Sequence, residues 1–330
     1  MKIKVAQIGT SRFSHGNEIF NCLKKFPDVF EIAGYAMPEN ENEKFPDRVA
    51  SFKEYKEMTV EEILNDISIK AVVIETEEIY LTKYALMAAK AGKHIHMEKP
   101  GGQSIEDFEQ LMDIIKKNGT VFHTGYMYRY NPVIKDFIKR AKAGEIGDIV
   151  SVEAQMSCRH GEECVIWLST FDGGVMFFLG CHLVDLVYQI QGMPQRIIPM
   201  NKSTKRFDGV TSKDNAFALL EYERGASFVK VNASETGGFE RRNLVITGTK
   251  GRFMICPLER TISYPNQVTV YNEIVSEDWN ASSEMKQTES FDRYSEMMLS
   301  FAAMVRGEKQ NPFTCDYELE LFKLVKKCCE

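Results

Sequence analysis

The sequence contains no long apolar run and no excess of positive charge. Its 330 residues include 41 Lys and Arg against 47 Asp and Glu, a net charge of −6 at pH 7. Because no basic patch or stripe runs along the chain, we expect no nucleic-acid partner. Because no apolar segment is long enough for a signal peptide or a membrane span, we expect a cytoplasmic protein with no membrane partner.

The eight cysteines are scattered and include no Cys-x-x-Cys pair. This usage is typical of reduced cytosolic thiols and argues against a disulfide framework. The segment 158–164, which begins and ends with cysteine and contains His160, suggests zinc, but its spacing matches no common zinc site. We therefore expect no bound metal.

Internal repeats and low-complexity linkers are also absent, and the length accommodates two domains. Up to about residue 122, short apolar runs alternate with helical patterns, which predicts a parallel sheet with right-handed crossovers. The expected strands are 3–8, 30–37, 71–74 and 95–97, and the expected helices include 60–66, 85–89 and one that Ser104 opens and Gly119 closes.

Strands dominate after residue 122, which predicts a mostly antiparallel sheet with helices on one side. Tight turns are expected at 223–225 and 248–251. We therefore predict an α/β domain of residues 1–122 and an α+β domain of residues 123–330. The expected strands of the second domain are 149–155, 216–222, 227–231, 243–247 and 268–271, and its helices are one opened by Asn131-Pro132, 175–190, 294–305 and 316–327.

The stretch 91–100 predicts a short buried strand that stops at Pro100, because proline cannot donate a ladder hydrogen bond. Glu98 and Lys99 would then project from the carboxyl end of a parallel strand, where ligands bind in open α/β sheets. A lysine there is a candidate acid or base, because burial and charged neighbours shift its pKa. The alternative is a surface turn with a solvated ion pair.

The turn after the first strand contains Gly9, Ser11, Arg12, Phe13 and Ser14. A dinucleotide fold has glycines here so that the backbone can approach a pyrophosphate at a helix N-terminus. Gly9 fits the first glycine, whereas Ser11 and Ser14 stand at the second and third. Serine is small and can donate hydrogen bonds to phosphate, so we expect this turn to bind a cofactor. The alternative is a small-residue turn without a ligand.

The end of the second strand normally supplies an acidic residue that meets the adenosine ribose. Met37 occupies the nearest equivalent position, and Glu39 follows two residues later. No Arg or Lys follows at once to hold a 2′-phosphate, which favours NAD, although Arg12 is a nearby cation that argues for NADP.

A second candidate site lies where Gly173-Gly174 leads into a strongly apolar helix. His182 and Asp185 are three residues apart on one face of that helix, so the carboxylate can orient the ring for proton transfer. The alternatives are a satisfied core histidine and a pair of metal ligands, for which no third ligand is evident.

Together these segments resemble the family of glucose–fructose oxidoreductase, inositol dehydrogenase and related sugar dehydrogenases (Gfo/Idh/MocA). The resemblance implies an N-terminal Rossmann domain, a doubly wound parallel sheet, and a C-terminal domain whose large open sheet forms contacts in a homo-dimer or homo-tetramer. It also implies that Lys99 lies near both nicotinamide and a substrate hydroxyl, and that His182 is an acid/base or substrate ligand. The segments that carry the resemblance are 92–100, 128–132, 144–147, 173–185 and 294–307.

The sequence departs from the family pattern at two places, one of which comprises two adjacent residues. Phe178 stands where the family often has an aspartate, and Glu77 and Glu78 follow Thr76 where the family usually has Thr-Pro. Two carboxylates beside the cofactor groove would repel a pyrophosphate unless their side chains turn away.

We therefore expect an NAD(P)-dependent oxidoreductase that transfers hydride between nicotinamide and a sugar, polyol or related hydroxy compound. One alternative is a redox-assisted lyase or glycosidase of the same family. The other is a non-catalytic relative that binds a sugar or nucleotide. In the enzyme, Lys99 and His182 handle the proton, Thr76 and Glu98 join the first turn at the cofactor, and Arg129, Asn131 and Asp185 join Lys99 and His182 at the small-molecule substrate.

Overall fold

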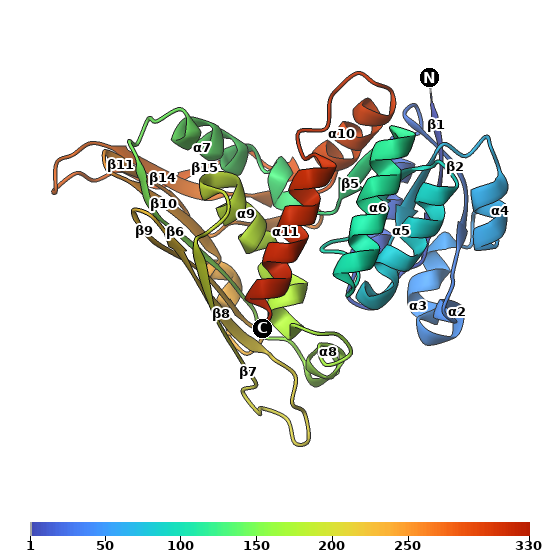
Figure 1. The fold of residues 1–330 in the computed structure, drawn as a ribbon, viewed down its shortest axis with the longest axis horizontal. Coiled ribbons are helices and arrows are strands. Elements are labelled where there is room, and N and C mark those ends of the chain that lie inside the picture. The colour runs from blue at the N-terminus through green and yellow to red at the C-terminus, as the bar shows by residue number, and fades with distance from the viewer. Residues whose placement is uncertain (1) are drawn as a thin grey trace. The chain divides into compact units, whose positions relative to one another are not determined.

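The computed structural model describes residues 2–330 and divides into two compact units. The first unit runs to Tyr126 and also includes Tyr294–Phe322, and the second comprises Met127–Arg293 with Lys323–Glu330; the elements of both are labelled in Figure 1. The division into domains of residues 1–122 and 123–330 that we expect from the sequence stays a prediction. The contacts assign Tyr294–Phe322 to the first unit, whereas that division placed the segment with the second.

The first unit contains a five-stranded, fully parallel sheet in the order β2-β1-β3-β4-β5. This sheet confirms the α/β fold predicted for the N-terminal part. Its elements are β1 (Ile3–Ile8), α1 (Gly16–Lys25), β2 (Phe30–Ala36), α2 (Glu41–Lys44), α3 (Pro46–Val49), α4 (Val60–Asn65), β3 (Ala71–Ile74), α5 (Leu81–Lys90), β4 (His94–Met97), α6 (Ile105–Asn118), β5 (Phe122–Thr124) and α10 (Ser295–Val305), with 3₁₀ turns at Ala50–Phe52 and Glu78–Tyr80.

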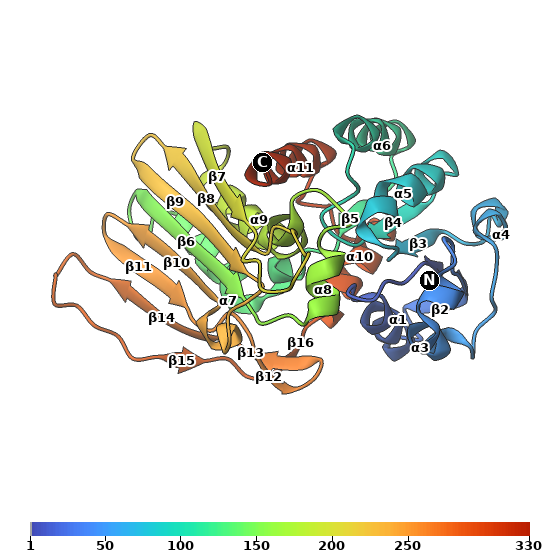
Figure 2. The same ribbon diagram turned by 90° about the horizontal axis from the view of Figure 1, so that it is seen from below.

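Helices cover both faces of this sheet, with α5 and α6 on one side and α1 on the other (Figure 2). Strands buried on both faces need continuous apolar runs, and β3 is accordingly fully buried. The expected ends of α6 are confirmed. The Ser104 side chain accepts a hydrogen bond from the Asp107 amide at 3.0 Å, and Gly119 closes the helix with φ +62°.

The second unit contains an eight-stranded sheet in the order β15-β14-β11-β10-β6-β9-β8-β7. Its neighbouring strands are antiparallel except for the parallel pair β6–β9, so the mostly antiparallel sheet is confirmed. The elements are η3 (Met127–Tyr130), α7 (Pro132–Lys142), β6 (Ile149–Ser157), α8 (Glu162–Trp167), a π-helical turn (Met176–Gly180), α9 (Cys181–Gln191), β7 (Arg196–Lys202), β8 (Asn215–Tyr222), β9 (Gly225–Asn232), η5 (Gly238–Arg241), β10 (Asn243–Gly248), β11 (Gly251–Ile255), β14 (Val270–Val275) and β15 (Lys286–Gln287). A small sheet contains β12 (Arg260–Ser263), β13 (Asn266–Val268) and β16 (Phe291–Asp292), and α11 (Cys315–Cys328) passes from the first unit to the second.

The large sheet buries one face under helices, including α7 and α9 (Figure 2). In β8, fully buried Ala216, Ala218 and Leu220 alternate with half-buried Phe217 and Leu219. Among residues 2–330 no helix covers the face that carries the second set. Both expected turns are confirmed, since β8–β9 and β10–β11 are hairpins.

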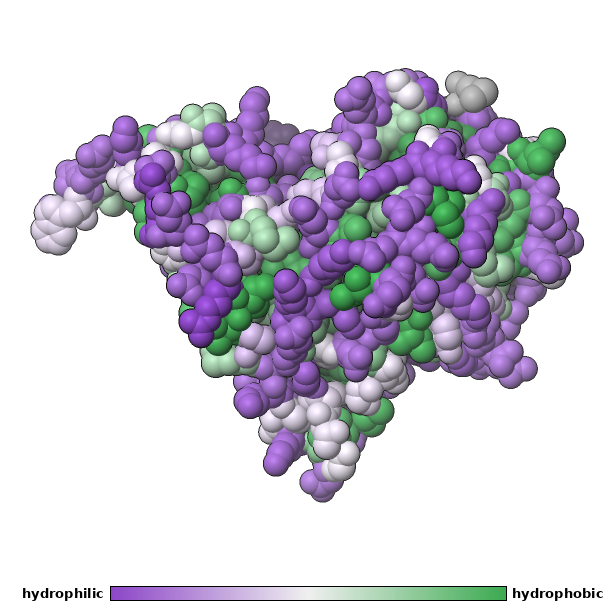
Figure 3. All heavy atoms as spheres, viewed as in Figure 1, coloured by the Kyte–Doolittle hydropathy of each residue, from purple (hydrophilic) through white to green (hydrophobic). Residues whose placement is uncertain are grey.

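On the face drawn in Figure 3, hydrophilic residues predominate and hydrophobic ones form small separate groups. Within residues 2–330, every helix is too short or too polar to cross a membrane.

Candidate active site

The first βα turn requires a glycine at position 9. Gly9 follows β1 with φ +85°, and a Cβ built there would lie 2.4 Å from the Thr76 side chain, which is itself fully buried. Only glycine tolerates both the dihedral and the approach. Gly9 and Thr76 thus meet at the carboxyl edge of the sheet, as the sequence predicts for a cofactor turn.

Ser11 and Ser14 hold the rest of this turn through their hydroxyls. The Ser14 hydroxyl accepts hydrogen bonds from the Ser11 and Gly16 amides, each at 3.2 Å. The Ser11 hydroxyl accepts from the Phe13 and Ser14 amides at 3.4 and 3.3 Å. A hydroxyl that accepts through its lone pairs can still donate its O–H, and that of Ser14 donates to the Glu75 carbonyl oxygen at 3.5 Å. The serines therefore replace glycine flexibility with side-chain hydrogen bonds.

Two acidic residues after β2 point in different directions. Glu39 has φ +61° and its carboxylate accepts a hydrogen bond from the Tyr84 hydroxyl at 2.7 Å and pairs with Lys83. Glu41, which the sequence reasoning missed, is fully buried, and its Oε2 accepts from the Thr10 amide at 3.3 Å. The acid that reaches the first turn is thus Glu41 rather than Glu39.

The other residues expected near the cofactor lie at the rim of this edge. Met37 is half-buried directly after β2. Arg12 is partly exposed and pairs with Asp47 at 2.8 Å, so its charge is already compensated.

The end of β3 carries three carboxyl groups with different surroundings. Glu77 is turned outward to Lys44 at 3.2 Å, whereas Glu75 and Glu78 are buried. Burial raises the pKa of Glu78 to about 8, although Lys99 lowers it, and burial likewise raises that of Glu75. Burial also raises the pKa of Glu41, to about 9. Glu41 and Glu78 are therefore largely neutral at pH 7, which reduces the repulsion expected against a pyrophosphate.

Lys99 lies where the sequence predicts it, directly after β4. Its Nζ is 3.6 Å from Glu98 Oε1, and the same oxygen accepts from the Lys99 amide at 3.0 Å. Both side chains are only 3% exposed, so the alternative of a solvated surface ion pair is excluded. A buried lysine beside a carboxylate is a typical proton-handling group.

In the second unit, His182 is buried on α9, which follows a π-helical turn that the sequence reasoning read as ordinary helix. The His182 ring packs edge-on against Tyr128, with ring centroids 5.4 Å apart. Phe178 lies in the π-helical turn and packs edge-on against Trp167. The aspartate of the family pattern is thus replaced by part of an aromatic cluster.

Asp185 lies on the same helix and pairs with Arg129. The Arg129 guanidinium donates to both Asp185 oxygens, at 3.0 and 2.9 Å, and Gln189 donates to the same carboxylate at 2.9 Å. Asn131 caps α7, because its Oδ1 accepts from the Val133 and Ile134 amides. Its Nδ2 donates to Thr269 at 2.8 Å, so the described contacts of Asn131 are structural.

Sequence reasoning also missed a buried charge cluster beside His182. The Tyr128 hydroxyl donates to Glu259 at 3.0 Å, and Glu259 pairs with Arg242 and, at 3.1 Å, with Arg293. Burial alone would raise the pKa of Glu259, but Arg293 and Arg242 bring it below its usual value. No local motif marks these residues, because tertiary folding brings them together.

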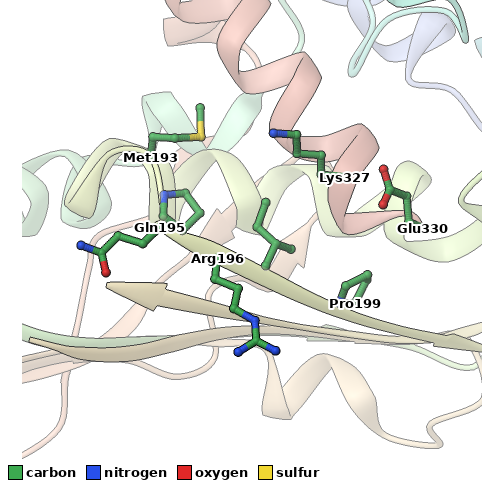
Figure 4. A pocket seen from close by; sticks show the side chains of 8 residues that line it. Met193, Gln195, Arg196, Pro199, Lys327 and Glu330 are labelled. Carbon is green, nitrogen blue, oxygen red and sulfur yellow. The ribbon is translucent and has the colours of Figure 1, made fainter. Parts of the chain in front are cut away.

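A hollow of about 260 Å³ in the second unit lies away from these residues, between the start of β7 and the end of the chain. Figure 4 shows Met193, Gln195, Arg196, Pro199, Lys327 and Glu330 around it. None of the site residues expected from the sequence lines this hollow, so it is no candidate for the active site.

Two family models match the chain. Residues 3–126 match the oxidoreductase family with an NAD-binding Rossmann fold, and residues 135–254 match the GFO/IDH/MocA C-terminal domain. The chain belongs to the GFO/IDH/MocA family of oxidoreductases. The family resemblance expected from the sequence is confirmed, and with it an NAD(P)-dependent oxidoreductase.

Two curated relatives carry named activities. The chain is 29% identical over 203 residues to scyllo-inositol 2-dehydrogenase (NAD(+)) of Bacillus subtilis, covering 59% of this chain and 57% of that one. It is 28% identical over 169 residues to D-xylose 1-dehydrogenase (NADP(+)) 2 of Haloferax volcanii, covering 51% of each. Both matches thus span little more than half of the relative's length.

Solved structures show the same fold over the whole chain. A 3-ketoreductase from Actinomadura kijaniata, in complex with NADP and TDP-benzene, matches with a TM-score of 0.80 at 16% identity, covering 99% of this chain and 96% of that one.

The residues of the first turn fit the dinucleotide that the family implies. Gly9 lets the turn lie close to Thr76, where a Cβ would clash, and the Ser11 and Ser14 hydroxyls accept hydrogen bonds from amides of the turn. Thr10, Ser11 and Ser14 would hold the pyrophosphate near the N-terminus of α1. Glu41 lies beside this turn, where its Oε2 accepts a hydrogen bond from the Thr10 amide.

Proposed function

We propose that the enzyme transfers hydride between a nicotinamide cofactor and a sugar, polyol or related hydroxy compound, with Lys99 and His182 handling the proton. The observation that carries this proposal is the buried Glu98–Lys99 pair at the edge of the sheet that also holds the Gly9 turn. The inositol and xylose dehydrogenases among the relatives support a polyhydroxylated substrate.

Lys99 hydrogen-bonds the reacting oxygen and exchanges a proton with it. The bound cofactor supplies the hydride acceptor or donor. The Glu98 carboxylate, 3.6 Å from Nζ, favours the ammonium form, which donates a hydrogen bond to a developing alkoxide. Burial of both groups strengthens that interaction, because little solvent screens it.

His182 serves as the second acid/base group or as a substrate ligand. Tyr128 fixes its ring from one edge, and Tyr128 is itself held by Glu259. Asp185 acts on Arg129 through its two hydrogen bonds and so positions the guanidinium for substrate hydroxyls. Asn131 contributes by fixing the start of α7 beside Arg129.

NAD is the cofactor that this turn favours. The carboxyl groups of Glu39 and Glu41 lie after β2, where a 2′-phosphate would require a cation, and Arg12 is already paired with Asp47. The Glu39 carboxylate, whose pKa is lowered by hydrogen bonds from Lys83 and Tyr84, opposes a phosphate, and a carboxyl group in either protonation state accepts hydrogen bonds from ribose hydroxyls. The relatives include both NAD- and NADP-dependent enzymes, so the preference depends on these residues.

The uncovered face of the large sheet supports a homo-oligomer. It carries half-buried Leu219 and the stacked rings of Phe217 and Phe228, with centroids 5.5 Å apart. Two such faces would bury these side chains against each other. Sedimentation at micromolar concentration should show a dimer or tetramer, and a monomer would contradict this part of the proposal.

A two-step experiment tests the function. Fluorescence titration with NADH and NADPH should show tighter binding of NADH. A screen of polyols and sugars with the oxidised form of the tighter cofactor should then yield net reduced cofactor. Product formed without net reduced cofactor would indicate the redox-assisted lyase, and failure of both cofactors to bind would contradict the enzyme altogether.

A further inference from the structure

A row of polar side chains crosses the buried parallel sheet of the first unit. Strand register places Gln7, Val73, His96 and His123 side by side on β1, β3, β4 and β5. Glu75 lies two residues beyond Val73 and therefore faces the same side. Gly16 of α1 and Phe301 of α10 cover this side, with Gly16 against Glu75 and Phe301 against both histidines. Parallel strands buried on both faces are normally apolar, so the row calls for an explanation.

The two histidines and Glu75 are close enough to form one hydrogen-bonded chain. His96 Nδ1 and His123 Nδ1 are 2.7 Å apart, so one of these two nitrogens carries a hydrogen and the other accepts it. His96 Nε2 lies 3.8 Å from Glu75 Oε1, and both side chains are 0% exposed. Within residues 2–330, His96 Nε2 and both Glu75 carboxyl oxygens have no hydrogen-bond partner. A small rotation of the Glu75 carboxyl group would bring its oxygen within hydrogen-bond distance of His96 Nε2.

The protonation states that burial favours complete such a chain. Burial lowers the pKa of His96 to about 3, which keeps its ring neutral. Burial raises the pKa of Glu75 well above its usual value, and the nearby carboxylates Glu98 and Glu18 raise it further. Arg48 and Lys99 oppose that rise. A protonated Glu75 supplies the donor that His96 Nε2 lacks.

We propose that Glu75, His96 and His123 form a buried hydrogen-bonded chain, here called the proton store, that holds or releases one proton. Its hydrogen bonds run in opposite directions in the two protonation states, and the charge on Lys99 determines which state is favoured. The existence of the proton store does not depend on the proposed function, whereas its effect on catalysis through Lys99 does. Glu75 and Glu98 are neighbours at the ends of β3 and β4, and Glu98 pairs with Lys99. An ionised Glu75 favours the Lys99 ammonium, and by linkage the ammonium favours ionised Glu75.

The two states differ by one proton. In the protonated state, Glu75 O–H donates to His96 Nε2, His96 Nδ1–H donates to His123 Nδ1, and neutral His123 carries its single ring N–H on Nε2. In the ionised state, His96 Nε2–H donates to the Glu75 carboxylate and His123 Nδ1–H donates to His96 Nδ1. On ionisation the Glu75 O–H, His96 Nδ1–H and His123 Nε2–H bonds break, and the His96 Nε2–H and His123 Nδ1–H bonds form. The net change is one proton lost to solvent.

Histidine ¹⁵N NMR of the cofactor-free protein measures these states directly, because the chain has only six histidines. Signals are assigned with His96→Phe and His123→Phe. As the pH is raised across the range in which the protein stays folded, His96 Nε2 should change from a bare, pyridine-like nitrogen to a protonated, pyrrole-like one. A His96 tautomer that stays constant over this range would overturn the proposal.

Two substitutions of buried carboxyl groups form a matched pair. Glu75→Gln keeps the shape but cannot ionise, so the tautomer change should disappear. Glu78→Gln removes another fully buried carboxyl group near Lys99 that does not belong to the Glu75–His96–His123 hydrogen-bonded chain. The change of the His96 tautomer should therefore persist in this variant. Loss of the change in both variants, or in neither, would overturn the assignment to Glu75.

Lys99→Met tests the coupling without relying on turnover. Removal of the positive charge should raise the midpoint of the tautomer change by about one pH unit or more, and an unchanged midpoint would overturn the link to Lys99. If Lys99→Met keeps full turnover while the midpoint moves, the proposed function fails and the store stands. If turnover is lost and no tautomer change exists, the store fails and the proposed function stands. In Glu75→Gln, a shifted pH profile of kcat/KM shows positioning through Lys99, and an unshifted profile would overturn that role.

Discussion

The first unit buries Glu41 and Glu78 with few cations beside them, whereas the second unit pairs buried Asp185 and Glu259 with arginines. Glu41 and Glu78 have pKa values raised by burial to about 9 and 8. Glu259 has a pKa held below its usual value by two arginines despite burial. Neutral acids at the first site leave an anionic ligand tolerable, while the ionised network of the second holds Tyr128 rigidly. Buried Glu41 and Glu78 of the first unit are therefore largely neutral, whereas Glu259 of the second unit is ionised.

The arginine side of this comparison is tested by Arg242→Met. Arg242 is buried and pairs with Glu259, so its removal leaves a buried carboxylate with less compensation. Breaking such a pair costs about 3–5 kcal/mol of unfolding free energy. The neighbouring Arg241, 61% exposed in its pair with Glu235, is a matched control, and Arg241→Met should cost less than about 1 kcal/mol. Urea unfolding measures both, and equal losses would contradict the contrast.

The neutral-acid side is tested by Glu78→Gln. The folded pKa of Glu78, about 8, lies above its unfolded value, so its contribution to stability is present below about pH 4.5 and is lost as the pH rises through 8. Glutamine does not ionise. The variant should therefore match the parent near pH 4.5 and exceed it at pH 9 by a few kcal/mol, at about 1.4 kcal/mol per pKa unit. A gain that is independent of pH would contradict a neutral Glu78.

The helix caps of the two units give the smallest expected difference. Asn131→Ala removes the cap of α7 and also leaves buried Thr269 without that donor, whereas Ser104→Ala removes an exposed cap of α6. Loss of a cap costs about 1 kcal/mol, and the buried Asn131 should lie near the upper value of about 2 kcal/mol. Thermal unfolding compares the two variants, and a larger loss for Ser104→Ala would contradict the structural role of Asn131.

Local signals were sufficient for much of the fold. The apolar run of β3, the serine and glycine that bound α6 and the turn between β8 and β9 are determined by residues near one another in the sequence. β7 was missed because its sequence contains Pro199 and several polar residues and so lacks a clear apolar strand pattern. An edge strand tolerates both features. The π-helical turn before α9 was missed because it has the same apolar spacing as ordinary helix.

The residues of the candidate site likewise fall into those that a local motif predicts and those that only the tertiary structure brings together. Gly9, Glu98 and Lys99 could be predicted because each belongs to a motif at a strand end, and the structure places them at one sheet edge. Glu41 and Glu75 could not, because a glutamate carries no local signal of burial. Their positions depend on which helices cover the sheet, which only the tertiary structure determines.

The central claim is that Lys99 handles the proton of the reaction, and the turnover of Lys99→Met tests it most directly. Lys93 is the matched control, because it is a buried lysine at the opposite end of β4 whose Nζ donates to the Asp66 and Ile69 carbonyls. Lys99→Met should lower kcat about 10²–10⁴-fold with cofactor binding retained, the range for loss of a general acid/base. Lys93→Met should leave kcat within a few-fold of the parent. Unchanged kcat in Lys99→Met, or an equal loss in both variants, would contradict the claim.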